Sequence, residues 1–148
     1  ARGAEVIVGA VSPRGRGDPI AQAQRYARAL AATATAAGVR LLMVGGAGSL
    51  RLPNGKMLVE TLPDDMLEPR AMVAARNAVA ESHADWTYFS PALHFDPGER
   101  SGNYRLGTTD LLFDANGECR ISVEDYCAAM VDEIERPTYR RGFMAIAY

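Results

Sequence analysis

Three strand-like apolar runs alternate with two segments of helical character in the first part of this chain. The apolar runs cover residues 5–11, 39–44 and 85–90, and the helical segments cover residues 19–37 and 67–82. The middle run is almost wholly apolar, which is typical of a strand buried on both faces of a parallel sheet. Strand–helix–strand repeats form right-handed crossovers. The sequence therefore predicts an α/β fold, with a parallel sheet flanked by helices.

Local signals predict where the two helices begin and end. Asp18 precedes Pro19, which is the pattern of an N-cap followed by proline at the first helical position. Gly38 predicts a left-handed stop at the end of the first helix. Asp64 and Asp65 are the expected caps of the second helix.

The last third of the chain differs in character, because its expected strands are short and close together. The expected segments are strands at 104–106, 111–113 and 119–121, a turn at 114–118, a helix at 123–135 and a final strand at 143–148. Ser122 is the expected cap of that helix. These segments predict a small C-terminal hairpin region beside the main sheet. The length of the chain predicts one domain over residues 1–148.

Composition excludes several classes of partner. Hydrophobic residues make up 48% of the chain and charged residues 23%, which is ordinary for a globular domain. The formal net charge of −2 gives no electrostatic footprint for nucleic acid. No apolar run approaches the ~20 residues that cross a bilayer. We therefore expect neither a nucleic-acid partner nor a membrane partner.

The cysteines and histidines do not predict a metal site. Cys119 and Cys127 are eight residues apart, which is not the spacing of a C-x-x-C motif. His83 and His94 are the only histidines, so a four-ligand metal site is not expected. Two unpaired thiols and the lack of a recognisable signal peptide predict the reducing cytoplasm.

Small, polar or proline residues follow each of the three apolar runs. They are Ser12, Pro13, Gly45, Gly46, Ser49, Ser90, Pro91 and Ala92. Ligands of open parallel sheets bind beyond the carboxyl ends of the strands, and glycine lets the main chain approach a ligand closely. The eight residues are therefore candidates for one binding crevice. Plain turns and strand caps without a ligand are the alternative for each group.

Two side chains are candidates for catalysis. The Ser49 hydroxyl could donate a hydrogen bond to a substrate carbonyl. His94 follows the third apolar run and is the candidate that titrates near pH 7. A glycine-rich turn without a ligand is the alternative for Ser49, and a histidine without a catalytic role is the alternative for His94.

One common proton-transfer arrangement is missing from the sequence. Enzymes that place tyrosine and lysine four residues apart on one helix face use the ammonium to lower the pKa of the phenol. Lys56 is the only lysine, and Leu52 stands four residues before it. A Tyr-x-x-x-Lys pair is therefore excluded.

Four stretches of the chain resemble a known family. They are LMVGGAGSL at residues 42–50, DWTYFSP at 85–91, PGERSGNYRLG at 97–107 and RISVEDY at 120–126. In this order they resemble the atypical short-chain dehydrogenase/reductases, and within them the NAD(P)H-binding NADH-flavin reductase group related to NmrA-like and biliverdin reductase B-like proteins. The resemblance implies a partial Rossmann-like fold. Family members begin with a strand and a G-x-x-G-x-x-G turn that holds the pyrophosphate, and this chain is expected to begin at their fourth strand.

The resemblance also implies a cofactor and an activity. The cofactor would be NAD(P)H, with the residues after the first run on its ribose side and those after the third run at the nicotinamide carboxamide. Gly45, Gly46 and Ser49 stand where classical relatives keep a catalytic serine. The implied activity of the longer parent is hydride transfer to a flavin or a similar flat acceptor. A non-catalytic NAD(P) sensor of NmrA type and an inactive truncated fragment are the alternatives.

Overall fold

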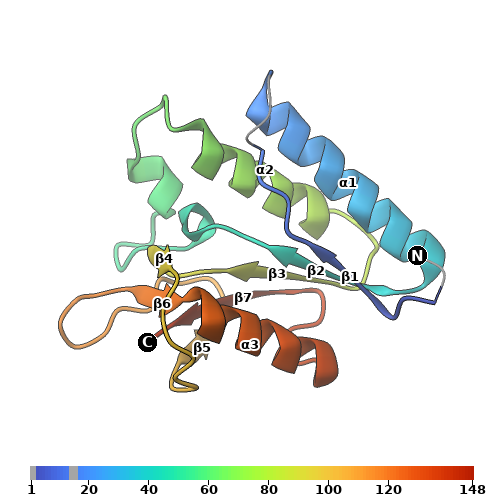
Figure 1. The fold of residues 1–148 in the computed structure, drawn as a ribbon. Coiled ribbons are helices and arrows are strands. Elements are labelled where there is room, and N and C mark those ends of the chain that lie inside the picture. The colour runs from blue at the N-terminus through green and yellow to red at the C-terminus, as the bar shows by residue number, and fades with distance from the viewer. Residues whose placement is uncertain (1–2, 14–16) are drawn as a thin grey trace.

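The central sheet has five strands, and four of them run parallel. The computed structural model describes residues 3–13 and 17–148. The strands, in spatial order, are β1 (Val6–Gly9), β2 (Arg40–Val44), β3 (Trp86–Ser90), β7 (Gly142–Ala147) and β5 (Arg105–Gly107). The first four are parallel neighbours, whereas β5 is antiparallel to β7. This arrangement confirms the predicted α/β fold with a parallel sheet (Figure 1).

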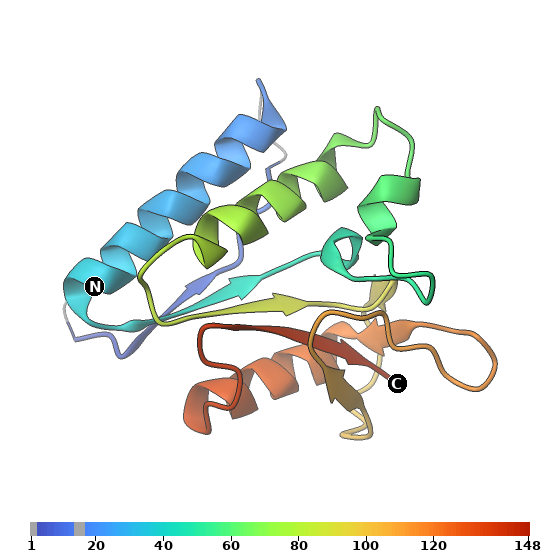
Figure 2. The same ribbon diagram turned by 180° about the vertical axis from the view of Figure 1, so that it is seen from behind.

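Helices cover both faces of this sheet. Helices α1 (Pro19–Ala37) and α2 (Leu67–Ala80) lie side by side on one face, and α3 (Val123–Glu135) covers the other face (Figures 1 and 2). Two short 3₁₀ helices, η1 (Ala47–Ser49) and η2 (Leu58–Thr61), lie between β2 and α2. The result is a three-layer arrangement in which both sides of the sheet are buried.

The ends of α1 follow the predicted chemistry, but the start of α2 does not. The Asp18 carboxylate accepts a hydrogen bond from the Ile20 main-chain N–H at 2.9 Å, and Gly38 has φ of 64°. For α2 the predicted aspartate caps are wrong, because Met66 is the N-cap and has no capping side chain. Asp64 lies too far before the helix and instead binds the Arg70 guanidinium at 2.8 Å.

Each face of the sheet has its own apolar core. Between the sheet and the α1–α2 pair, the contacts are made largely by alanines, which let helices approach closely. The fully or nearly fully buried alanines of these helices are Ala23, Ala27, Ala31, Ala34, Ala71, Ala75 and Ala78. On the α3 face the core is aromatic and aliphatic, and the rings of Phe89 and Tyr126 stack with centroids 4.2 Å apart.

The predicted C-terminal hairpin is wrong in its pairing. The turn itself forms, because the Asp114 N–H donates to the Glu118 carbonyl at 2.8 Å. Residues 111–113 are not a strand, and β6 (Arg120–Ser122) pairs in parallel with β4 (His94–Asp96). Leu111 is buried in the α3-side core, so its apolar character serves side-chain packing and not strand pairing.

Candidate functional site

A cleft of about 640 Å³ lies at the carboxyl ends of β1, β2 and β3. This is the edge at which parallel sheets bind ligands. Five of the eight predicted crevice residues line this cleft, namely Ser12, Gly45, Gly46, Pro91 and Ala92. The structure therefore gathers residues from three strand ends that are far apart in the sequence.

The rest of the cleft wall is mainly apolar. It includes side chains from η2, from the start of α2 and from the segment after β3. These are Leu58, Leu62, Met66, Leu67, Pro69, Met72, Leu93 and Phe95. An apolar cleft with a few polar groups is the usual form of a small-molecule site.

Ser49 and Ser90 lie behind the cleft wall and not on it. They are 2% and 3% exposed, and their hydroxyl oxygens are 3.0 Å apart. The Ser49 hydroxyl also donates to the Gly46 carbonyl at 2.9 Å. The pair thus ties the loop after β2 to the end of β3. Pro13 is also buried and does not line the cleft.

Gly45 is required by packing between neighbouring strands. A Cβ atom on Gly45 would collide with the Tyr88 ring and would lie 2.9 Å from the Phe89 carbonyl oxygen. The Tyr88 hydroxyl donates to the Met72 carbonyl at 2.7 Å, and burial raises the pKa of this phenol far above its ordinary value. Tyr88 therefore stays neutral and fixed, and it fills the space where a side chain at Gly45 would stand.

A hydrogen bond links two segments that border the cleft. The Ser12 hydroxyl, after β1, donates to the Glu68 carboxylate in the first turn of α2 at 2.9 Å. Both residues are exposed and both line the cleft. Sequence reasoning did not single out Glu68, because an acidic residue in the first turn of a helix is common for electrostatic reasons alone.

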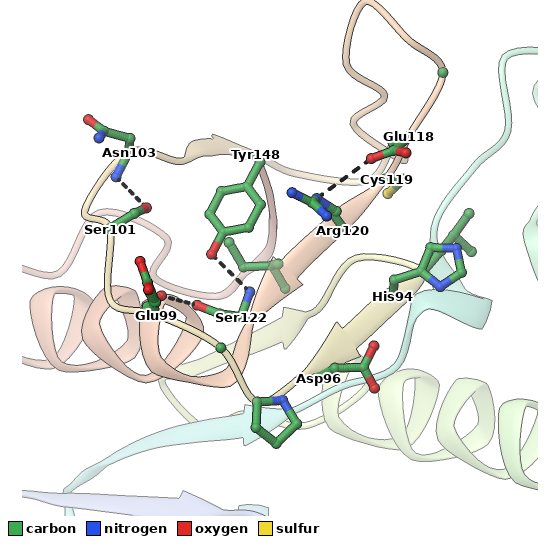
Figure 3. A pocket seen from close by; sticks show the side chains of 15 residues that line it. His94, Asp96, Glu99, Ser101, Asn103, Glu118, Cys119, Arg120, Ser122 and Tyr148 are labelled. Carbon is green, nitrogen blue, oxygen red and sulfur yellow. Dashed lines mark hydrogen bonds and ion pairs between the residues drawn. The ribbon is translucent and has the colours of Figure 1, made fainter.

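His94 lies in a second cleft, of about 930 Å³, formed by β4, β6, the loop after β4 and Tyr148. Side chains alternate along β4, so Phe95 lines the first cleft whereas His94 and Asp96 line the second. Figure 3 shows Arg120 beside the Tyr148 ring in this second cleft. The Arg120 guanidinium carbon lies 5.9 Å from the centroid of that ring. The catalytic role of His94 stays a prediction, and the structure does not bring its imidazole into the first cleft.

The wall of the second cleft is held by one buried carboxylate. Asp125 accepts hydrogen bonds from the Ser101 N–H at 3.1 Å, the Gly102 N–H at 2.8 Å and the Tyr148 hydroxyl at 3.0 Å. Burial alone would raise the pKa of Asp125, but the donated hydrogen bonds outweigh it and lower the pKa to about 2. Asp125 thus fastens residues 97–107 to the start of α3, which links two of the stretches that carry the family resemblance.

No group of three His, Cys, Asp or Glu side chains among the described residues is arranged to hold a metal ion. Over the same part of the chain, none of the helices combines the length and the apolar character that crossing a membrane requires.

Ser49→Ala is expected to lower the free energy of unfolding by about 1 kcal/mol, because it leaves the buried Ser90 hydroxyl without its side-chain partner. Urea denaturation of Ser49→Ala, Ser90→Ala and the double variant measures this loss. The double variant should lose less than the sum of the two single losses, since both remove the same hydrogen bond. Strict additivity would show that the hydroxyls do not interact.

Comparison with known proteins agrees with this geometry. YwnB of Bacillus subtilis is 39% identical over 109 residues, which cover 68% of this chain and 51% of YwnB. The chain therefore spans about half the length of that relative.

Two solved structures are similar over nearly the whole chain. A protein of Burkholderia pseudomallei, described as a candidate exported protein, has a TM-score of 0.84 at 38% identity and matches 99% of this chain and 73% of its own. A candidate NADH-flavin reductase of Streptococcus pneumoniae has a TM-score of 0.87 at 24% identity and matches 98% of this chain and 72% of its own. The latter likeness shows a shared Rossmann-like fold. Residues 1–134 match the NAD(P)H-binding family, and the chain belongs to that family.

Proposed function

We propose that this chain forms the nicotinamide and acceptor part of an NAD(P)H-dependent oxidoreductase that transfers hydride to a flavin or a similar flat acceptor. One observation carries the proposal. In a member of the NAD(P)H-binding family, an apolar cleft of about 640 Å³ lies at the carboxyl ends of three parallel strands. This is the edge at which open α/β sheets bind nucleotides.

The cleft suits the uncharged half of the cofactor. Its described lining contains one charged side chain, the carboxylate of Glu68, and no cationic side chain. A neutral nicotinamide ring can lie against the main chain of Gly46 and against Pro91. The Ser12 hydroxyl and the Glu68 carboxylate are suited to ribose hydroxyl groups. This proposal assigns the pyrophosphate to another part of the protein.

The chemistry can proceed without a protein acid. Bound NAD(P)H would supply a hydride, the acceptor ring would take this hydride and a proton from water, and the products are NAD(P)⁺ and the reduced acceptor. The chain's own residues orient the two rings and exclude water. The phenols of Tyr88 and Tyr126 take no part, because both donate to main-chain carbonyls in the core. This agrees with the absence of a Tyr-x-x-x-Lys pair.

The proposal places the protein in the cytoplasm. The free thiols of Cys119 and Cys127 support this location. The proposed reaction would also need a pool of reduced nicotinamide cofactor. Since the chain spans only part of its relatives, turnover belongs to the proposal for the whole protein and not to the domain by itself.

Cofactor binding can be tested by filling the cleft. Val11 lines the cleft and is 50% exposed, so Val11→Trp should fill the cleft at little cost to the fold. Val131, on α3, is 51% exposed and does not line the cleft, so Val131→Trp is the matched control. Millimolar NADH or NADPH is expected to raise the melting temperature of the unaltered chain and of Val131→Trp by a few degrees, and that of Val11→Trp much less.

Turnover of the whole protein is measured as loss of NAD(P)H absorbance with riboflavin or a quinone. In the whole protein, His94→Ala should turn over like the unaltered protein, because the His94 imidazole faces the second cleft. Binding without turnover would support the NmrA-type sensor. A melting temperature that neither cofactor changes would refute the proposal for this chain and favour the inactive fragment.

A further inference from the structure

We propose that the second cleft is a binding site for an uncharged saccharide ring. This inference does not rest on the proposed function, because alternate side chains of β4 point into the two clefts and separate them. Three features of the described residues carry it. They are the walls that hydrogen bonds hold in place, the fixed aromatic ring in the cleft, and the polar side chains on its different sides.

Hydrogen bonds hold the loop between β4 and β5, which forms one wall of this cleft, in place. The Gly98 N–H donates to the Glu124 carboxylate at 2.8 Å. The Ser122 hydroxyl donates to the Glu99 carbonyl at 2.8 Å. The main-chain bonds to Asp125 described above fasten the same loop a third time. A ligand therefore meets a wall that is already formed, and little loss of loop entropy opposes its binding.

The ring of Tyr148 gives this cleft an aromatic surface, and its hydroxyl end is fixed. The hydroxyl accepts a hydrogen bond from the Ser122 N–H at 3.2 Å and donates one to the Asp125 carboxylate at 3.0 Å. Figure 3 shows the face of this ring, with Asn103 on one side of it and Arg120 on the other. A saccharide ring has an apolar face of C–H groups that packs on such an aromatic surface. Because the Tyr148 ring is already held, stacking on it costs little side-chain freedom.

Polar side chains line the cleft on several sides. In Figure 3 they lie apart from one another and do not converge on one point, and they are His94, Asp96, Glu99, Asn103 and Arg120. Arg120 has an ion pair, with Glu118 at 3.6 Å, whereas the other four side chains make no hydrogen bond or ion pair with the described part of the chain. Together the five side chains offer both donors and acceptors. The hydroxyl groups of a saccharide ring also point outward in several directions, and each can donate and accept. The cleft therefore matches a saccharide ring stacked on Tyr148.

Charged ligands fit the same residues less well. A cation is held by carboxylates that converge, whereas Asp96, Glu99 and Glu118 lie apart in Figure 3. A phosphate group would need Arg120, which already has Glu118 beside it. An uncharged ring uses the donors and acceptors of the cleft without competing for this ion pair. The observations therefore favour a neutral saccharide over a charged molecule.

Saturation-transfer difference NMR on the whole protein tests the proposal. The probes are the methyl glycosides of glucose, galactose, mannose and N-acetylglucosamine. We expect at least one of them to receive saturation, most strongly at the C–H protons of one face of its ring. Glucosamine and glucose 6-phosphate, the cationic and anionic counterparts of glucose, should bind no more tightly than the best neutral glycoside. Val11→Trp, which fills the first cleft, should bind that glycoside as the unaltered protein does.

Substitutions in the second cleft locate the bound glycoside. Asp96→Ala is expected to weaken binding by about threefold to tenfold, because it removes a hydrogen bond to a hydroxyl group of the ligand. Tyr148→Phe keeps the aromatic ring and should retain binding, whereas Tyr148→Leu should abolish the saturation signal. Glu135→Ala is the matched control for Asp96→Ala, since Glu135 is exposed on α3 and does not line the cleft. Circular dichroism melting curves establish which variants are folded, and Asp96→Ala tests the site by itself if Tyr148→Leu is not.

The proposal is overturned if none of the four glycosides receives saturation, or if a charged counterpart binds more tightly than all of them. Unchanged binding by folded Asp96→Ala and Tyr148→Leu would also overturn it, because the saccharide would then lie elsewhere. Loss of binding in Val11→Trp alone would place the saccharide in the first cleft, with the same consequence. NAD(P)H binding is measured separately through the melting temperature. A failed saccharide site therefore leaves the proposed function in place, and a failed cofactor test leaves the saccharide site in place.

Discussion

Glu133→Ala is expected to lower the free energy of unfolding by about 3–5 kcal/mol, because it leaves a buried guanidinium without its counter-ion. Glu133 is 3% exposed and forms an ion pair with Arg40, which is 9% exposed. The Arg40 guanidinium also donates to the Glu133 carbonyl at 2.6 Å and to the Thr87 hydroxyl at 2.7 Å. The cluster joins the end of α3 to the starts of β2 and β3.

Glu133 also binds main-chain N–H groups after α3. Its carboxylate accepts hydrogen bonds from the Thr138 and Tyr139 N–H groups, each at 2.9 Å. Arg40→Met should therefore cost less than Glu133→Ala, since the carboxylate keeps these two donors. The double variant should lose less than the sum of both, because the buried unpaired charge is gone. Guanidinium denaturation measures each free energy, with Glu135→Ala on the same helix as the exposed control.

A loss for Glu133→Ala no larger than that for Glu135→Ala would show that the cluster does not support the fold. Cofactor affinity gives a further check, because the cluster lies at the opposite end of the strands from the cleft. Below their melting temperatures, all these variants should bind NAD(P)H as the unaltered chain does.

Asp125→Asn is expected to cost about 2–3 kcal/mol of folding free energy. The asparagine amide keeps the shape of the side chain. The Asp125 carboxylate accepts hydrogen bonds from Ser101, Gly102 and Tyr148, whereas the NH₂ group of the amide is a donor and cannot accept them. Asp132→Asn is the control, because Asp132 is on the same helix and is 52% exposed. An equal loss for the two variants would contradict the bracing role of Asp125.

The same carboxylate makes stability depend on pH. In the folded chain the pKa of Asp125 is about 2, which is below its ordinary value of about 3.9 in an unfolded chain. The stabilisation is therefore complete above the ordinary pKa and is lost as the pH falls from about 4 through 2. Denaturation curves collected over this interval should show a steeper fall for the unaltered chain than for Asp125→Asn. Parallel curves would show that another carboxylate controls acid unfolding.

The sequence predicted the parts of the fold that depend on local chemistry and on long apolar patterns. The Asp18 cap and the Gly38 stop formed because both act within one helical turn. The buried run of β2 formed a central strand because it is apolar on both faces. The wrong predictions concern strand pairing between segments that are far apart in the sequence. A short apolar run such as residues 111–113 can be buried by side-chain packing or by strand pairing, and the sequence does not distinguish the two.

The candidate site was predictable in place but not in detail. In the sequence, the end of each strand can be recognised by the small or polar residues that follow an apolar run. Five of these residues line the cleft. The sequence could not show that Ser49 and Ser90 point at each other behind the wall, since their contact depends on the register of β2 and β3. The position of His94 depends on the alternation along β4, where one residue decides between two clefts.

The two edge strands of the sheet, β1 and β5, differ in how readily a further strand could pair with them. At one border, β5 is three residues long and runs against its neighbour, and such brief antiparallel edges resist lateral extension. At the other border, β1 runs with its neighbours and carries Val8 with 43% of its surface exposed. Any additional parallel strand would therefore join beside β1, next to the cleft, and would widen the edge of the sheet that carries the cleft without rearranging the layers beneath it.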